Sequence, residues 1–483
     1  MKKSKYLTII IFLIIVSSYF ILNFKIGDDA FKNLKFPNKE QRTLIKKYLF
    51  PYKFIAQQSE IISGQKVKIS MQQEIISDQK LANLKAEIYE AQIDADIAIQ
   101  ESVINLSNNL TLKKYLLTSG FYAGINQASP GSGYIGFYED NLVIISSRGM
   151  LAYKKINTDG KINFKKIKSN INKFIGINQF EKGKNFSLKD LFIFKDKIFI
   201  SYTEEIKEDC WNIGVISGDM NYKNIEFTKL FSPKNCVHSI NNIDKEFSSG
   251  QSGGRIVSFD DNHILLSIGD FVSRHLAQNK NSVNGKIIKI NINNNDYEIV
   301  SMGHRNPQGL LFDKENNFLL ETEHGPRGGD EINLIDLNKI NQDKILNYGW
   351  AISSYGEHYG GKSKNNKKKY EKYPLYKSHS DHGFIEPLKV YMPSVGISNI
   401  VKIGKNKYVH GTMGGSFGRG REYNPEKRAG DKSLFFFELN KQKQIINLKQ
   451  VKVFERIRDL EFKNNKLYLF MENTASIGVI NLN

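Results

Sequence analysis

Short apolar runs separated by turn residues recur from about residue 110 to the C-terminus, and this pattern constrains the fold more than any other feature. Helical spacing is nearly absent there, and turn pairs such as Asp159-Gly160 stand between the runs. Runs of this kind predict β-strands, and their density favours a β-propeller, in which four-stranded blades surround a central channel. The runs are Leu142–Ser146, Leu191–Phe194, Ile198–Ile200, Ile213–Ile216, Ile256–Phe259, Ile264–Ile268, Lys286–Ile292, Leu310–Phe312, Phe318–Leu320, Ile400–Ile403, Ser433–Leu439, Lys466–Leu469 and Ile477–Ile480.

The chain is long enough for a large core and more than one module, with 483 residues of which 40% are hydrophobic. Its formal net charge of +19 comes from lysines and arginines spread along the whole sequence. No nucleic-acid-binding motif accompanies them. The charge therefore predicts solubility and attraction to anionic surfaces, and no nucleic-acid partner is expected.

The most informative stretch runs from Gly303 to Leu334. Its centre, Leu310–Phe312 followed by a turn and Phe318–Thr322, predicts a β-hairpin. The Gly-Pro and Gly-Gly pairs after the hairpin let the backbone come close to a ligand. Arginine, asparagine and bare carbonyl groups suit an anionic ligand together with a hard cation.

This stretch resembles the soluble-type quinoprotein glucose/sorbosone dehydrogenase family. The matching segments are GHRNPQGL, E-x-GP and DEINL, followed by NYGW at Asn347–Trp350. The resemblance covers about Ser119 to the C-terminus and implies an all-β, six-bladed propeller. It also implies oxidation of the C1 hydroxyl of an aldose or related sugar, with pyrroloquinoline quinone (PQQ) and calcium as cofactors. A six-bladed hydrolase of the lactonase type is disfavoured by these matches.

The resemblance assigns expected roles within the motif. Arg305 matches the arginine near the reactive quinone oxygen, where it stabilises developing negative charge. Asn306 matches a cofactor contact, and His324 stands where some members have a cofactor-contacting glutamine. Gly325 and Pro326 match the residues whose carbonyls bind calcium.

Two arginines near the C-terminus match the R-x-R-D segment of the family. Arg456 and Arg458 alternate on a predicted strand, so both side chains lie on one face and suit the carboxylates of the quinone cofactor. Without the resemblance, an exposed strand face would be the favoured interpretation of such a pair. Ser394 matches another cofactor contact, and Met413 stands about where the family often has a cofactor-binding lysine.

One departure concerns the catalytic base. The segment Ser252–Asp270 resembles the family pattern H-x-G-G-R…I-G-D, in which the histidine is the general base and the aspartate orients it. Asp270 keeps its place, but Gln251 stands at the histidine position, and the neighbouring placement is Gly250. A glutamine amide is not basic near neutral pH. The alternative prediction is therefore a catalytically degenerate propeller that acts as a binding or scaffold module.

The N-terminus predicts export and anchoring. Basic residues precede an apolar run, Tyr6–Phe24, of about the length that spans a bilayer. Residues 1–29 are predicted as a cytoplasmic tip and uncleaved signal-anchor helix, with a cleaved signal peptide as the alternative. The propeller is then expected in the periplasm or outside a bacterial inner membrane, close to a respiratory quinone or cytochrome as electron acceptor.

Residues 30–109 predict a juxtamembrane segment and a mainly helical stalk, and residues 110–483 the propeller. Leu81, Leu84, Ile88 and Ala91 follow a 3–4 spacing that allows weak oligomerisation through a coiled-coil-like seam. The competing interpretation is a period of two over Ile93–Ile99.

The two cysteines and two clustered histidines leave alternatives open. For an exported chain, Cys210 and Cys236 favour one disulfide over two buried thiols. His379 and His382 lie in a segment rich in polar residues, which favours a polar loop over a metal site.

Overall fold

The computed structural model describes part of the chain and divides it into two units, Met1–Glu87 and Ile88–Asn483. In the first unit, residues 9–18 and 58–73 are helical. Among the described residues, no helix combines the length and apolar character of a membrane span. The predicted anchor and stalk lie largely outside these residues. The described residues are 9–18, 55–56, 58–73, 101–117, 121, 132–155, 164–182, 185–340, 345–414 and 432–482.

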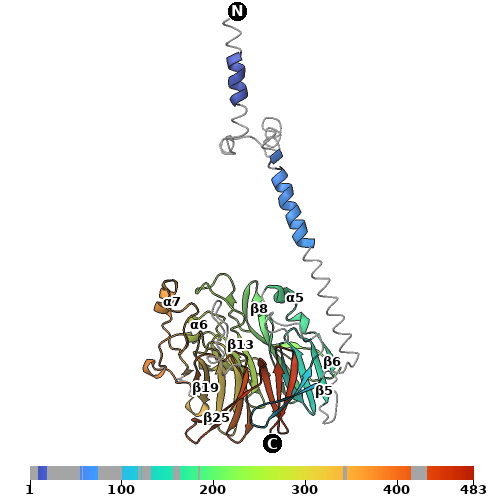
Figure 1. The fold of residues 1–483 in the computed structure, drawn as a ribbon, viewed down its shortest axis with the longest axis vertical. Coiled ribbons are helices and arrows are strands. Elements are labelled where there is room, and N and C mark those ends of the chain that lie inside the picture. The colour runs from blue at the N-terminus through green and yellow to red at the C-terminus, as the bar shows by residue number, and fades with distance from the viewer. Residues whose placement is uncertain are drawn as a thin grey trace, which may run out of the picture. The chain divides into compact units, whose positions relative to one another are not determined.

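The second unit is a propeller of six sheets, which confirms the predicted six-bladed β-architecture (Figure 1). Within each blade, the first four strands from the channel outward pair in antiparallel fashion, whereas the outer strands β10 and β20 pair in parallel with β6 and β16. From the innermost strand outward, the first three blades are β3 (Gly133–Tyr138), β4 (Asn141–Ser146), β5 (Leu151–Lys155), β6 (Lys165–Ser169) and β10 (Asn224–Ile225); β7 (Leu188–Phe194), β8 (Lys197–Lys207), β9 (Cys210–Asp219) and β11 (Thr228–Phe231), with β12 (Val237–His238) also on β9; and β13 (Gly253–Ser258), β14 (His263–Ile268), β15 (Lys286–Asn291), β16 (Tyr297–Met302) and β20 (Leu346–Asn347).

The other three blades complete the ring. Short helices lie in the connections. The strands are β17 (Pro307–Asp313), β18 (Phe318–Glu323), β19 (Asp330–Asp336) and β21 (Lys389–Tyr391); β22 (Ile397–Gly404), β23 (Lys407–Thr412), β24 (Ser433–Leu439) and β25 (Ile445–Lys452); and β26 (Ile457–Lys463), β27 (Lys466–Met471), β28 (Ser476–Asn481), β2 (Thr111–Leu116) and β1 (Glu101–Asn105). The helices are α5 (Ile177–Lys182), α6 (His275–Gln278) and α7 (Lys367–Lys372), with 3₁₀ turns η2 (Ile171–Lys173), η3 (Leu337–Lys339), η4 (Lys364–Asn366) and η5 (Ser380–His382).

Strands from the two ends of the propeller close the ring in one sheet. β2 pairs with the C-terminal strand β28, with Leu112 opposite Ile480, and β1 pairs with β2. Among the described residues, the sheets of the propeller begin with β1 at Glu101, which lies before residue 110. The sequence pattern missed β1 because most of this edge strand is exposed, so it lacks an apolar run and depends on pairing with β2.

Each predicted apolar run lies on a strand, apart from the final residues of two runs, Phe259 and Ile292. Their side chains fill the spaces between blades. Ile213 and Val215 of β9, for example, share one buried cluster with Leu266 of β14 and Ile288 of β15. Burial of such side chains between adjacent sheets stabilises the ring by about 1.5–3 kcal/mol for each. The predicted hairpin is also confirmed, because β17 pairs antiparallel with β18. The predicted disulfide joins Cys210 and Cys236.

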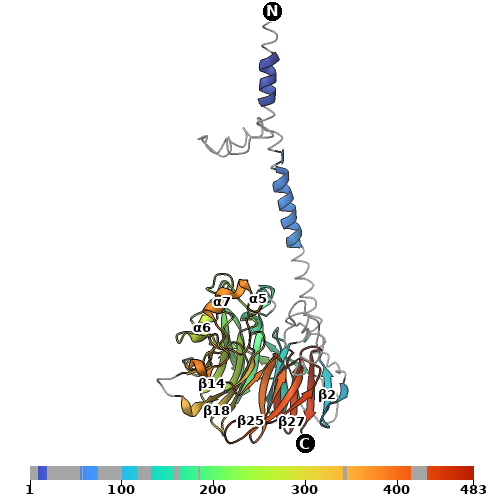
Figure 2. The ribbon, with the colours of Figure 1, turned by 60° about the vertical axis from the view of Figure 1, so that its left-hand side comes forward.

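The inner strands determine where a central site can lie. β3, β7, β13, β17, β22 and β26 are neighbours around the channel. Because adjacent strands are antiparallel, the N-terminal ends of these inner strands share one end of the channel with the connections from second to third strands. Helices α5, α6 and α7 gather at this end of the propeller in both views (Figures 1 and 2).

Candidate active site

A cavity of about 190 Å³ lies at the N-terminal ends of the inner strands. All six blades contribute residues to it, counting Met413 directly after β23, so the closed ring of the propeller assembles its wall. The lining residues are Tyr134, Asn185, Lys189, Gly250, Ser252, Gly253, Arg255, Pro307, Gln308, His324, Met413, Arg456, Arg458 and Glu472.

The wall of this cavity is strongly cationic. Lys189, Arg255, Arg456 and Arg458 line it together with a single carboxylate, Glu472. Arg456 Nε lies 3.1 Å from Glu472 Oε2, and Arg458 Nε lies 2.5 Å from Glu472 Oε1. Burial opposes ionisation of Glu472, but the two arginines lower its pKa to about 2. Arg456 and Arg458 face this one lining carboxylate, with Lys189 beside them, and their excess of positive charge gives the cavity the character of an anion-binding site.

Arg255 ties the inner strands together behind the cavity. Its Nη1 donates to Asp190 Oδ1 of β7 at 2.8 Å and to Asp459 Oδ1 of β26 at 2.7 Å. Its Nε and Nη2 donate to the backbone carbonyls of Gln308 and Arg458, both at 2.7 Å. One guanidinium on β13 therefore joins β7, β17 and β26 around the channel.

Lys189 is a basic residue of the cavity wall whose pKa is lowered by its surroundings. Its Nζ donates to the Asn185 carbonyl at 2.7 Å. Burial, together with the nearby charges of Arg458 and Arg148, lowers the pKa of Lys189 to about 7. Gly254 makes room for this side chain, because a Cβ at Gly254 would meet Lys189 Cβ at 2.3 Å. A lysine with this pKa is partly neutral, and hence basic, near pH 7.

The predicted motif residues Arg305 and Asn306 organise the loops beside the cavity rather than line it. Arg305 is buried, and its Nη1 donates to the carbonyls of His324 and Gly325, both at 2.7 Å. Asn306 Nδ2 donates to the Gly250 carbonyl, and Asn306 Oδ1 accepts from the Gly253 backbone N–H, each at 3.2 Å. These contacts connect the two motif segments.

The loop that carries His324, Gly325 and Pro326 is tightly built. A Cβ at Gly325 would meet the Gly329 carbonyl oxygen at 1.9 Å, so only glycine fits there. Asp330 Oδ1 accepts from the Gly325 backbone N–H at 3.2 Å. His324 lines the cavity, and burial is the main cause that lowers the pKa of this imidazole, which favours its neutral form.

Gln251 and Asp270 are not assembled as a catalytic pair. Asp270 Oδ2 accepts from Trp350 Nε1 at 2.7 Å, and its Oδ1 accepts from the Val272 backbone N–H at 2.8 Å. Gln251 contributes backbone hydrogen bonds to Ser248 and Phe271. Within residues 185–340, which are described without a gap, no side-chain hydrogen bond joins the two residues, and Gln251 is not among the residues that line the cavity.

The remaining predicted residues lie apart. Ser394 is half-buried in the loop before β22, and its Oγ has no hydrogen-bond partner in the described part of the chain. His379 and His382 have separate surroundings: His379 Nδ1 lies 2.9 Å from the Tyr348 carbonyl oxygen, whereas His382 stacks on Tyr376.

Sequence reasoning gave no role to several residues that shape this site. They are Lys189, Arg255, Gln308 and Glu472. Arg255 stood in a quoted motif, but its carboxylate partners lie 65 and 204 positions away in the sequence. The burial of Lys189 had no local signal, because it depends on Gly254 of the next blade.

Comparison with known proteins identifies the family. Residues 184–478 match the sequence profile described as Glucose / Sorbosone dehydrogenase. The chain belongs to this family. Among curated relatives, an uncharacterized protein of Synechocystis is 29% identical over 43% of the chain and 50% of its own length. The aldose sugar dehydrogenase YliI of Escherichia coli is 34% identical over 23% of the chain and 31% of its own length.

Other proteins also match the chain, although each alignment with a curated relative spans half or less of that relative's length. Quinoprotein glucose dehydrogenase B of Acinetobacter calcoaceticus is 31% identical over 23% of the chain and 28% of its own length. A crystal structure of soluble aldose sugar dehydrogenase from Escherichia coli in the apo-form matches with a TM-score of 0.54 and 20% identity, over 73% of the chain and 96% of that structure. The relatives that match this member of the family therefore include proteins named as sugar dehydrogenases.

Proposed function

We propose that the chain is a membrane-anchored, outward-facing quinoprotein that oxidises the C1 hydroxyl of an aldose or related sugar. The carrying observation is the cationic cavity, where Arg456 and Arg458 face one carboxylate beside Lys189, inside a propeller of the glucose/sorbosone dehydrogenase family. A cofactor with several carboxylates, such as PQQ, has the charge that this wall favours. Family membership supports oxidation of a sugar.

The residues present have the charges and donor atoms that PQQ and calcium require. Arg456 and Arg458 would hold carboxylates of PQQ, and the carbonyls of Gly325 and Pro326 would serve calcium, which prefers oxygen ligands. The Gly325 carbonyl accepts one hydrogen bond from Arg305, and a carbonyl oxygen has a second lone pair with which it would bind a cation. When bound, the cofactor accepts the hydride from the sugar.

The proton of the sugar hydroxyl needs an acceptor from the protein. Gln251 cannot supply one, since an amide is not basic. Lys189 lines the same cavity, and its pKa of about 7 makes its neutral form available near physiological pH. We therefore assign Lys189 as the general base that replaces the expected histidine.

The second candidate function is a degenerate propeller that binds a ligand without turnover. Two observations favour it: Gln251 stands at the histidine position, and the carboxylate of Asp270 is already occupied by Trp350 and Val272. In this alternative, the cationic cavity retains an anionic ligand, and Lys189 serves only to bind it.

The proposed location rests on the apolar run Tyr6–Phe24, which supports a single-pass anchor in a bacterial inner membrane. A propeller held at the outer face would deliver electrons to a respiratory quinone or a cytochrome. The 3–4 spacing within the stalk supports its weak oligomerisation.

Dye reduction by the full-length chain tests the proposal. The protein, purified in mild detergent, is loaded with PQQ and calcium and given a panel of aldoses. We expect reduction of the dye that requires PQQ and at least one sugar. PQQ binding without turnover for any sugar, with activity appearing in Gln251→His, would support the degenerate module instead.

A further inference from the structure

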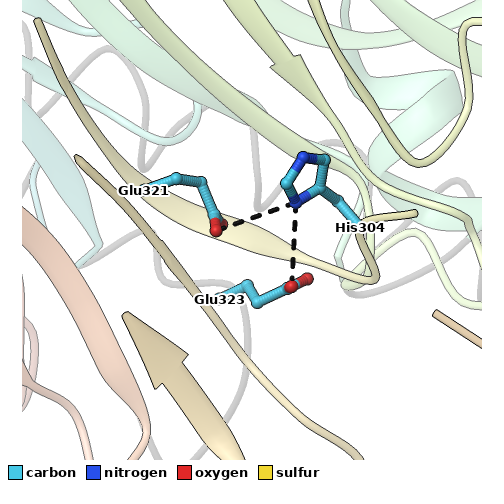
Figure 3. A group of neighbouring side chains, drawn as sticks. All are labelled: His304, Glu321 and Glu323. Atoms are coloured by element: carbon cyan, nitrogen blue, oxygen red, sulfur yellow. Dashed lines mark ion pairs between the residues drawn. The ribbon is translucent and has the colours of Figure 1, made fainter. Parts of the chain in front are cut away.

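A separate cluster of side chains that could bind a metal ion lies directly before the loop that carries His324, Gly325 and Pro326. His304, Glu321 and Glu323 converge there and are almost wholly buried, with exposed fractions of 0%, 0% and 4% (Figure 3). Glu321 and Glu323 share one face of β18, because side chains alternate along a strand. Asn333 of β19 lies directly opposite Glu321.

The spacing of the donor atoms leaves room for an ion between them. His304 Nδ1 lies 3.8 Å from Glu321 Oε2 and 3.7 Å from Glu323 Oε1. These separations are too long for N–H···O hydrogen bonds, whose usual range is about 2.7–3.2 Å. Two donors on a tetrahedral ion with bonds of about 2.0–2.1 Å lie about 3.3–3.4 Å apart. A contraction of a few tenths of an ångström would therefore convert this cluster into a coordination shell.

The imidazole is already oriented for metal binding. His304 Nε2 lies 2.8 Å from Ser301 Oγ, whereas Nδ1 has no hydrogen-bond partner. When Nε2–H donates to Ser301, the lone pair of Nδ1 points at the two carboxylates, as Figure 3 shows for the ring nitrogen joined to them by dashed lines. A hydrogen bond from the far nitrogen is the usual way in which proteins fix a metal-binding histidine.

The two carboxylates of this cluster have hydrogen-bond donors but no basic side-chain partner among the described residues. Among the described residues, no lysine or arginine side chain makes an ion pair with Glu321 or Glu323. Burying an ionised carboxylate without a cation costs several kcal/mol. Asn333 Nδ2 donates to both carboxylates, at 3.0 and 3.1 Å, while its Oδ1 has no partner. Exchange of the amide N and O positions would turn Oδ1 toward a cation.

We propose that His304, Glu321 and Glu323 bind a divalent transition-metal ion of the Zn²⁺ or Mn²⁺ class, with Asn333 Oδ1 as a fourth donor. An imidazole nitrogen combined with carboxylates selects such ions, whereas calcium takes oxygen ligands alone. The site is therefore distinct from the calcium expected at Gly325 and Pro326.

The ion would hold in place the loop that carries His324, Gly325 and Pro326. Glu323 Oε2 accepts from the Arg305 backbone N–H at 2.5 Å, and Arg305 in turn holds the carbonyls of His324 and Gly325. A metal on Glu323 would thereby fix the end of β18 directly before the loop that lines the cavity. This role is structural and does not depend on turnover.

Metal analysis of the full-length, untagged protein tests the proposal. Protein purified without chelators should contain about one equivalent of zinc or manganese by mass spectrometry. Removal with a chelator should lower Tm by several degrees. Adding Zn²⁺ or Mn²⁺, but not Ca²⁺, should restore Tm.

Glu321→Gln separates a metal site from a merely buried pair of acids. If the site binds metal, this variant loses the metal and melts below the wild type in Zn²⁺- or Mn²⁺-containing buffer. Glu204→Gln, at a buried carboxylate of β8, is the matched control and should keep the metal. Three results together overturn the proposal: the purified protein holds no zinc or manganese, its Tm does not change when either ion is added, and Glu321→Gln is as stable as the wild type. In that case the substitution has only removed a buried charge.

Discussion

Arg255→Met is expected to lower the free energy of unfolding of the propeller by about 3–5 kcal/mol, because removing one member of a buried ion-pair network leaves its partners uncompensated. The partners are Asp190 and Asp459, which are 4% and 2% exposed. They belong to β7 and β26, so the loss falls on the contacts that hold separate blades around the channel. Denaturant unfolding followed by tryptophan fluorescence measures the change.

Lys197→Met is the control for this prediction. Its partner Asp219 is largely solvent-exposed, and exposed ion pairs contribute little to stability. The control should unfold close to the wild type. If Arg255→Met unfolded at the same denaturant concentration as Lys197→Met, the channel network would not stabilise the ring in the way described.

Lys189→Met is expected to lower kcat for the aldose by about 10²–10⁴-fold, the usual contribution of a general base. The pKa of Lys189 is lowered to about 7, so its neutral, basic form increases as the pH rises through 7. Wild-type kcat should therefore rise between about pH 6 and pH 8, and the variant should lose this dependence. A pH–rate profile on PQQ-loaded protein measures both.

Lys189→Arg provides the matched variant, because it keeps a positive charge in the cavity but offers no neutral form near pH 7. It should bind PQQ and lose turnover as Lys189→Met does. If either variant retained the wild-type rate and pH profile, Lys189 would not be the base.

The strands were largely predictable from sequence, because their apolar runs report burial on a local scale. Leu142–Ser146 and Ile264–Ile268, for example, fall within β4 and β14. The edge strand β1 was not predictable, since its exposed residues form a strand only through pairing with β2. β1 lies in the last blade because β2, its partner, pairs with the C-terminal strand β28 and so closes the ring.

The site was predictable only where a motif carried it. Arg456 and Arg458 line the cavity, whereas the Asp270 carboxylate accepts a hydrogen bond from Trp350, 80 positions away in the sequence. Contacts of this range have no signature in one sequence. The same holds for His304, whose neighbours Glu321 and Glu323 are brought to it by the blade.

Titration of the calcium-containing, full-length protein with PQQ, followed by quenching of tryptophan fluorescence, tests the central claim most directly. We expect saturable binding of one equivalent. Arg458→Gln should weaken this binding by about 10–100-fold, the value of a charge-assisted hydrogen bond, while the exposed-residue control Arg327→Gln should not. Absence of saturable binding, or equal affinities for the two variants, would contradict a PQQ site in the cationic cavity.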